Sequence, residues 1–188
     1  AAGIPRLPDF SPLALKSPGA GFDLLTAAGW RREQPFVVLN PAGAFPTRRW
    51  PIDRYAAFAR LWTQRKNSDV RFLIMGDGRI AESAAVLKQA LGDRLLNLVG
   101  KTSVAQAFGL LGAAELVISD DLGSMHMAWA CGAPTVALLG STRADWASPP
   151  AGSRFVCLNS GDLPCGFCME ATCRMGDTRC LTRHTPEM

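Results

Sequence analysis

The residues best suited to chemistry lie in one short stretch, residues 120–128, which reads Asp-Asp-Leu-Gly-Ser-Met-His-Met-Ala. It follows a compact apolar run at residues 116–118, which predicts a strand, and it leads into a helix-like segment at residues 125–131. A glycine at such a turn lets a ligand approach the backbone, and the first N–H groups of a helix are unpaired and attract an anion. Carboxylates accept hydrogen bonds from hydroxyl groups. The stretch therefore predicts a pocket for a nucleotide-sugar, which is anionic in the middle and rich in hydroxyls at one end.

Two further loops have a similar composition, Asn-Pro-Ala-Gly at residues 40–43 and Gly-Ser-Thr at residues 140–142. Tight turns alone favour these residue types, so each loop by itself has a purely structural interpretation. Both loops, however, follow predicted strands, and the carboxyl ends of parallel strands open on one edge of a sheet, where ligands bind. We therefore expect these two loops and residues 120–124 to converge in space.

The elements that must position these loops are predicted from apolar periodicity. Five strand cores are expected at residues 36–39, 70–75, 95–98, 116–118 and 135–139. Helices are expected at residues 20–28, 55–62, 80–91, 104–111 (with Ser103 as N-cap) and 125–131. Near-continuous apolar strands that alternate with helices, joined by right-handed crossovers, predict a doubly wound, Rossmann-like α/β fold with a parallel sheet. We expect a lead-in with one helix at residues 1–35, a nucleotide-sugar-binding domain at 36–159, and an irregular Cys-rich segment at 160–188 packed on the same domain.

Composition excludes several classes of protein. The chain has 188 residues, a formal net charge of +4 and basic residues that are spread out, which argues against a nucleic-acid partner. No apolar run approaches the length of a transmembrane segment, and residues 1–10 lack a signal-peptide pattern. The missing initiator Met and the irregular opening suggest a piece of a longer protein, although processing would look the same.

A glycine-rich loop at residues 76–81 matches the dinucleotide fingerprint in its G-x-G-x-x-A form. That fingerprint normally occupies the first strand–helix turn of a fold, with an acid at the end of the next strand. Here the loop follows the second strand, and the next strand ends in Leu-Val-Gly at residues 98–100. We therefore prefer a glycine turn with some ligand contact over NAD or FAD binding.

Four of the six cysteines are clustered near the C-terminus with the spacing Cys165-x2-Cys168-x4-Cys173-x6-Cys180. This spacing permits a tetrathiolate zinc site, although the second pair is wider than in a usual zinc ribbon. Reduced structural cysteines and two disulfides are the alternatives, and disulfides are unusual in an intracellular enzyme. Cys131 and Cys157 lie in apolar runs and are expected to be buried small hydrophobes.

Four motifs, in order, resemble those of family-nine glycosyltransferases, the ADP-heptose:lipopolysaccharide heptosyltransferases. They are residues 40–51, with Pro-Ala-Gly and Arg-Arg-Trp-Pro, and residues 97–103, 121–128 and 134–142. The Cys-rich segment closes the match, which covers residues 36–188. The resemblance implies the C-terminal, donor-binding half of a GT-B enzyme that transfers a heptose-type sugar with inversion and without a required cofactor. It also implies an ADP-sugar donor, and a lipopolysaccharide core or lipid A acceptor bound through an N-terminal half that this chain lacks.

The resemblance also implies roles for individual residues. Arg48 would be the cation that stabilises the departing phosphate, Asp121 would hold sugar hydroxyls, and the catalytic base would lie outside this chain. The remaining donor-binding positions implied by the match are Gly43, Leu122, Gly123, Ser124, Met125, His126 and Thr142. Backbone N–H groups of residues 123–125 and near residue 142 would be fixed donors to the diphosphate.

Some residues keep two interpretations. His126 could reach a phosphate or a hydroxyl, or it could bond a neighbouring loop. Asp120 could contact the ligand or simply be favoured by the helix N-terminus. Lys101 and Thr102 could form only a turn and a helix entry, and Trp50 is expected to pack rather than to stack on adenine.

The chain departs from the family pattern at two positions. Arg48 stands where the family has Lys, which keeps the charge and permits bidentate phosphate binding. Leu122 replaces a Ser or Thr, which removes a hydroxyl beside the donor. The resemblance also implies a cytoplasmic protein that is peripheral to the inner membrane. Two other functions remain open: a non-catalytic nucleotide-sugar-binding module, and a zinc-stapled interaction module whose contact surface is the cysteine tail.

Overall fold

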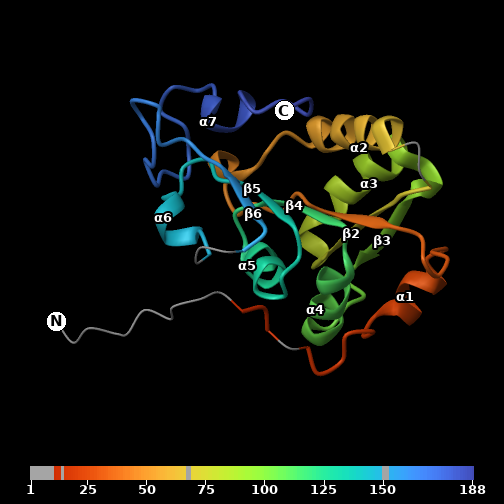
Figure 1. Cartoon of the computed structure of the whole chain (residues 1–188). Coiled ribbons are helices and arrows are strands. Elements are labelled where there is room, and N and C mark those ends of the chain that lie inside the picture. Colours follow the sequence, from red (N-terminus) through yellow and green to blue (C-terminus); the bar gives the residue numbers. More distant parts are fainter. Residues whose placement is uncertain (1–10, 14, 67–68, 150–152) are drawn as a thin grey trace, which may run out of the picture.

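The computed structural model describes residues 11–13, 15–66, 69–149 and 153–188 (Figure 1). The sequence pattern discussed for residues 1–10 lies outside the described residues. Six strands form a single sheet in the order β3-β2-β1-β4-β5-β6, and every neighbouring pair is parallel. The strands are β1 (Phe36–Asn40), β2 (Arg71–Gly76), β3 (Leu95–Val99), β4 (Leu116–Asp120), β5 (Thr135–Leu138) and β6 (Phe155–Leu158). The expected parallel sheet is confirmed.

The edge strand β6 is absent from the sequence-based prediction. It pairs with β5 in parallel, from Phe155 opposite Thr135 to Leu158 opposite Leu138. Its four residues are mostly half-exposed, and Val156 is exposed. An edge strand buries little of its surface, so its sequence lacks the strong apolar signal of the central strands.

Helices cover both faces of the sheet, as expected for a doubly wound fold. On one face the core contains strand residues such as Val37 and Leu39 together with residues of α2 (Ile52–Lys66) and α3 (Ala81–Leu91). On the other face Val38 and Leu73 pack with α1 (Phe22–Ala27), α4 (Val104–Ala113) and α5 (Gly123–Ala130). Figure 1 shows these two helical layers on opposite sides of the strands. The short helices are η1 (Pro46–Arg48), η2 (Gly78–Ile80), η3 (Gly92–Arg94), α6 (Ala144–Ala147) and α7 (Arg179–Thr182).

The Cys-rich segment contains only the short helix α7 and otherwise consists of turns and bends. Hydrogen bonds attach it to the rest of the fold: Met169 N donates to Ser141 O (2.9 Å), the Thr47 hydroxyl donates to Glu170 O (2.5 Å), and the Ser160 hydroxyl donates to Gly140 O (2.7 Å). Trp50 Nε1 (2.9 Å) and Arg54 Nη1 (2.6 Å) both donate to the His184 carbonyl.

All six cysteines are free thiols. Within the ranges that the structure describes, no group of cysteines is arranged to hold a metal. Cys131 and Cys157, expected to be buried small hydrophobes, are half-buried, and Cys157 packs against a small core cluster that contains Ala137 and Leu139.

None of the helices in the described ranges is both long enough and apolar enough to cross a bilayer.

Helix α4 begins with the predicted N-cap. The Ser103 hydroxyl accepts a hydrogen bond from Gln106 N (3.3 Å), and the Gln106 side chain accepts one from Ser103 N (2.9 Å). This reciprocal pair is a capping box, which satisfies two backbone donors at the helix start.

We predict that Ser103→Ala lowers the free energy of unfolding by about 1 kcal/mol, because it removes the side-chain acceptor of the capping box. The matched control is Val104→Ala, which truncates the next residue, a 70% exposed side chain in the same helix. Denaturant unfolding followed by circular dichroism measures both. Equal stability of the Ser103→Ala variant and the unmodified chain would show that the capping box does not contribute.

Candidate functional site

A cleft of about 460 Å³ opens where the loops after β1, β2 and β4 meet. These strands are neighbours in the sheet, and Asn40 at the end of β1 lies opposite Ser119 in β4, so the loops that follow start side by side. The cleft is lined by Pro41, Ala42, Gly43, Ala44, Arg49, Gly76, Asp77, Arg79, Ile80, Glu82, Ser83, Asp121, Leu122 and Gly123. The carboxyl edge of the sheet therefore carries the candidate site.

Asp121 joins the three loops that the sequence predicts to converge. Its Oδ2 lies 3.4 Å from Arg48 Nη1, and the same oxygen accepts a hydrogen bond from the Thr142 hydroxyl. The Asp121 side chain is 9% exposed and that of Arg48 is 22% exposed, so water screens this ion pair only in part. Arg48 comes from the loop after β1 and Thr142 from the loop after β5. The expected convergence of these distant loops is confirmed.

The neighbouring arginine, Arg49, lines the cleft directly. Its Nε donates to the Gly43 carbonyl at 2.6 Å, which holds the guanidinium along the wall formed by the loop after β1. Arg48 instead packs its guanidinium over the Phe45 ring, 5.4 Å from the centroid, and reaches the site through Asp121. Arg49 is therefore a second cation of the loop after β1 at the site, and the sequence-based prediction named only Arg48. The adjacent Arg-Arg pair was the available signal.

Asp120, the last residue of β4, is fully buried and has no contact with the cleft. Its carboxylate accepts three hydrogen bonds: from Gly43 N (3.1 Å), from Trp50 N (3.0 Å) and from the Tyr55 hydroxyl (2.9 Å). Its complete burial argues against the ligand contact considered from the sequence, and none of these three donors belongs to α5, the helix that follows. Asp120 instead binds Gly43 and Trp50, the two ends of the loop that carries Arg48 and Arg49, and so fixes this loop to the centre of the sheet.

Close backbone approach explains two of the glycines around the site. A Cβ on Gly43 would lie 2.0 Å from the Arg48 carbonyl oxygen, and a Cβ on Gly140 would lie 2.1 Å from the Thr47 carbonyl oxygen. Neither contact is possible for a larger residue without moving the backbone. Glycine at these positions lets the loop after β1 fold back on itself and pack against the loop after β5.

Helix α5 begins at Gly123, two residues earlier than expected, and no side chain caps it. The space beside the Gly123 Cα is open, so a ligand can approach this backbone. Met125 departs from its predicted role, because its N–H donates to the Leu122 carbonyl (3.0 Å) and its side chain is fully buried. The N–H groups suited to a ligand are therefore those of Gly123 and Ser124, at the positive end of the helix dipole.

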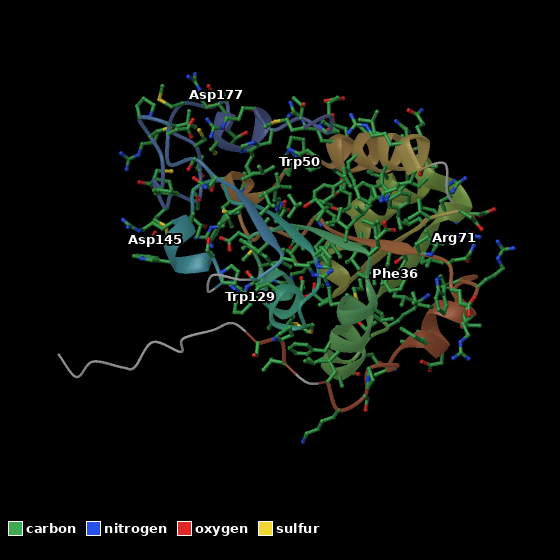
Figure 2. The ribbon with its side chains drawn as sticks, in the orientation of Figure 1. Phe36, Trp50, Arg71, Trp129, Asp145 and Asp177 are labelled. Carbon is green, nitrogen blue, oxygen red and sulfur yellow. The ribbon has the colours of Figure 1, made fainter. Side chains whose placement is uncertain are left out.

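The ring of His126 is half-buried on α5, and its Nδ1 accepts a hydrogen bond from Trp129 Nε1 (3.3 Å). It does not line the cleft, and a ligand role for His126 stays a prediction. Trp50 packs as expected: it is 5% exposed, contacts the Tyr55 ring edge-on, and donates from Nε1 to the His184 carbonyl (2.9 Å). Figure 2 shows Trp50 between the start of α2 and the C-terminal segment.

The glycine-rich loop at residues 76–81 lines the same cleft. Asp77 Oδ1 accepts from Arg79 N (2.9 Å) and caps the short helix η2, and the Arg79 side chain lowers the pKa of the Asp77 carboxyl to about 2. This geometry agrees with a glycine turn that also contacts a ligand. Glu82 and Ser83, on the first turn of α3, complete this wall and were missed from the sequence, where they read as ordinary helix residues.

We predict that Asp120 makes stability depend on pH. Burial raises the pKa of this carboxyl from 3.8 to about 7, so the folded chain binds the proton more tightly than the unfolded chain does. The contribution of Asp120 to the free energy of unfolding should therefore fall as pH rises from about 4 to about 7, by up to about 4 kcal/mol.

The variant Asp120→Asn has no charge at this position and should not show this decline. The measurement is urea unfolding of both chains at several pH values. A constant difference in stability between them across this pH range would contradict a raised pKa for Asp120.

Comparison with known proteins identifies relatives of this chain in sequence and in fold. The chain is 31% identical over 122 residues to lipopolysaccharide heptosyltransferase 2 of Salmonella typhimurium, covering 62% of this chain and 34% of that protein. The structure resembles that of Escherichia coli ADP-heptose lps heptosyltransferase II, with a TM-score of 0.69 and 22% identity, over 84% of this chain and 47% of the other. It also resembles E. coli heptosyltransferase WaaC with ADP-2-deoxy-2-fluoro heptose, with a TM-score of 0.55 and 20% identity, over 74% of this chain and 41% of the other.

The chain thus spans between a third and a half of the length of these relatives. A sequence model of one family matches residues 8–179. The chain belongs to glycosyltransferase family 9, the heptosyltransferase family.

Proposed function

We propose that this chain is the donor-binding part of a heptosyltransferase and binds an ADP-sugar in the cleft at the carboxyl edge of the sheet. The observation that carries the proposal is the convergence of Arg48, Asp121 and Thr142 beside the open backbone of Gly123. Cations and free N–H groups suit a diphosphate, and a carboxylate suits sugar hydroxyls. The related WaaC with ADP-2-deoxy-2-fluoro heptose supports an ADP-linked heptose as the donor class.

The proposed role in catalysis is stabilisation of the leaving group. As the bond from the anomeric carbon to the phosphate breaks, negative charge grows on the departing ADP. Arg48 and Arg49 are placed to balance this charge, and the N–H groups of Gly123 and Ser124 are donors that need no reorganisation. In the structure, Asp121 compensates the charge of Arg48. On donor binding, the phosphate takes over that compensation and Asp121 accepts hydrogen bonds from the sugar.

The proposed whole reaction is inverting transfer of the heptose-type sugar to a lipopolysaccharide core acceptor. The acceptor site and the catalytic base belong to a preceding half of the enzyme, as the partial coverage of the relatives suggests. Because lipopolysaccharide core is assembled on a lipid, the proposed place of action is the cytoplasmic face of the inner membrane.

A second candidate is a binding module without transferase activity. Leu122 lines the cleft at a position where the family pattern supplies a hydroxyl, and its side chain cannot hydrogen-bond a donor. Single-turnover transfer of sugar from ADP-heptose by the chain joined to its N-terminal half separates the two functions. Donor binding without transfer would identify the binding module.

We predict that Arg48→Ala weakens ADP binding by about 1.5–3 kcal/mol, the scale of a charge-assisted hydrogen bond. The matched control is Arg60→Ala, which removes an exposed arginine of α2 outside the cleft. Isothermal titration calorimetry with ADP measures both. Unchanged affinity of the Arg48→Ala variant would remove Arg48 from the donor site.

We predict that Asp121→Asn separates nucleotide binding from sugar binding. Because the variant loses the negative charge beside Arg48, it should bind ADP at least as tightly as the unmodified chain does. Its preference for ADP-heptose over ADP should fall roughly 10-fold, as expected for one lost hydrogen bond to a charged group. Calorimetric titrations with ADP and ADP-heptose, and with UDP- and GDP-sugars for comparison, give this ratio. An unchanged ratio would show that Asp121 does not hold the sugar.

A further inference from the structure

A histidine and a tryptophan on helix α5 lie in a row that begins at the cleft. Gly123, the first residue of the helix, lines the cleft. His126 follows Gly123 by three residues, and Trp129 follows His126 by three (Figure 2). Residues three apart are neighbours on a helix surface, so each member of the row lies beside the next.

The indole of Trp129 donates a hydrogen bond to one particular nitrogen of the histidine ring. Trp129 Nε1 lies 3.3 Å from His126 Nδ1, and the two rings meet edge-on, with an interplanar angle of 79° and centroids 6.2 Å apart. An indole N–H can only donate, so Nδ1 is the acceptor and carries no proton. A neutral imidazole of this kind has its proton on the other nitrogen, Nε2.

The other two protonation states of the ring do not fit this contact. The Nδ1–H tautomer and the imidazolium both have a hydrogen on Nδ1, which would face the indole N–H of Trp129. Two donors cannot form a hydrogen bond, and both side chains are half-buried, where the loss of a partner costs free energy. The contact therefore selects one of the three states of His126.

The second nitrogen of the same ring remains available. Among the described residues, no group forms a hydrogen bond with His126 Nε2. A protonated Nε2 can donate to a phosphate or hydroxyl oxygen, but it cannot take up a proton. The backbone N–H groups of Gly123 and Ser124 point out of the same end of α5, so a side-chain donor at His126 would extend this set.

We propose that Trp129 is a positioning residue, which holds His126 as the neutral Nε2–H tautomer so that the ring serves as a hydrogen-bond donor and not as a base. The oxygen that His126 meets would belong to the diphosphate or to the sugar of the donor. This contact with the donor rests on the proposed function, whereas the tautomer does not.

Nuclear magnetic resonance of the ¹⁵N-labelled chain tests the tautomer directly. Long-range ¹H–¹⁵N spectra at about pH 8, where an unperturbed imidazole is neutral, distinguish protonated from unprotonated ring nitrogens. The chain has only two histidines, so the variant His126→Gln identifies the signals of His126. We expect a protonated Nε2 and an unprotonated Nδ1 for this ring. A protonated Nδ1 would overturn the proposal.

The variant Trp129→Phe tests whether the indole selects this state, because it keeps an aromatic ring and removes the N–H donor. His126 should then show a detectable fraction of the Nδ1–H form. The matched control is Trp146→Phe, which alters a 69% exposed indole on α6 and should leave the His126 signals unchanged. A tautomer that is the same in Trp129→Phe and in the unmodified chain would refute the positioning role.

The unmodified chain provides a second test that does not require a variant to fold. Acidification protonates Nδ1 of His126 and so removes the acceptor of the hydrogen bond. The indole N–H signal of Trp129 should therefore move in step with the ring signals of His126. An indole signal that stays constant while His126 titrates would show that the two side chains are not hydrogen-bonded.

Calorimetry with ADP separates this inference from the proposed function. His126→Leu should weaken ADP binding roughly 10-fold, the scale of one hydrogen bond to a charged group. His126→Gln should restore most of the affinity, because its side-chain amide can place an N–H near the position of Nε2. Equal losses in both variants would contradict a donor role for His126. Absence of ADP binding by the unmodified chain would instead refute the proposed function, and the spectra would still decide the tautomer.

Discussion

The buried carboxylate of Asp120 is the interaction on which the proposed donor site depends. It lies at the end of β4, in the middle of the sheet, and accepts hydrogen bonds from both ends of the loop that carries Arg48 and Arg49. A third bond from Tyr55 fixes α2 to the same point. A buried charge without partners would be costly, so these three donors and the carboxylate require one another. The loop after β1 is thus anchored to the sheet by a buried residue that does not line the cleft.

In the proposed donor site, the positive charge of Arg48 is paired with the negative charge of Asp121. The Arg48–Asp121 pair is shielded from water in part, and the Thr142 hydroxyl orients the carboxylate from a third loop. Such a pair holds both side chains near the positions that a diphosphate and a sugar require, which reduces the ordering that binding must impose. Recognition of the proposed donor would thus depend on the relative placement of three loops that the sheet brings together.

The Cys-rich segment supports the same loops from the outside. It contacts Thr47 and Ser141, the neighbours of two site residues, and the Gly140 backbone packs directly on Thr47. Figure 1 shows the segment near β5 and β6, on the side of the sheet away from β3. Asp120 and this segment therefore hold the β1 loop from two directions. Loss of either restraint would change the position of this loop without removing a residue from the cleft.

Much of this organisation is determined by the sequence alone. Apolar runs of strand length alternating with helical periodicity specify the parallel sheet, and the topology of such sheets brings the loops after β1, β4 and β5 to one edge. The Ser103 capping box is likewise local, because its two partners are three residues apart. These features depend on near neighbours or on the general rules of α/β folds, so they can be inferred without coordinates.

Only the tertiary structure decided which side chains meet. The partners of Asp120 lie 65 to 77 residues away, and no local pattern distinguishes this carboxylate from Asp121 beside it. The same holds for the choice between Arg48 and Arg49 on the cleft wall and for the weakly apolar edge strand β6. Side-chain direction and burial at these positions follow from long-range packing, which residue type and spacing do not encode locally.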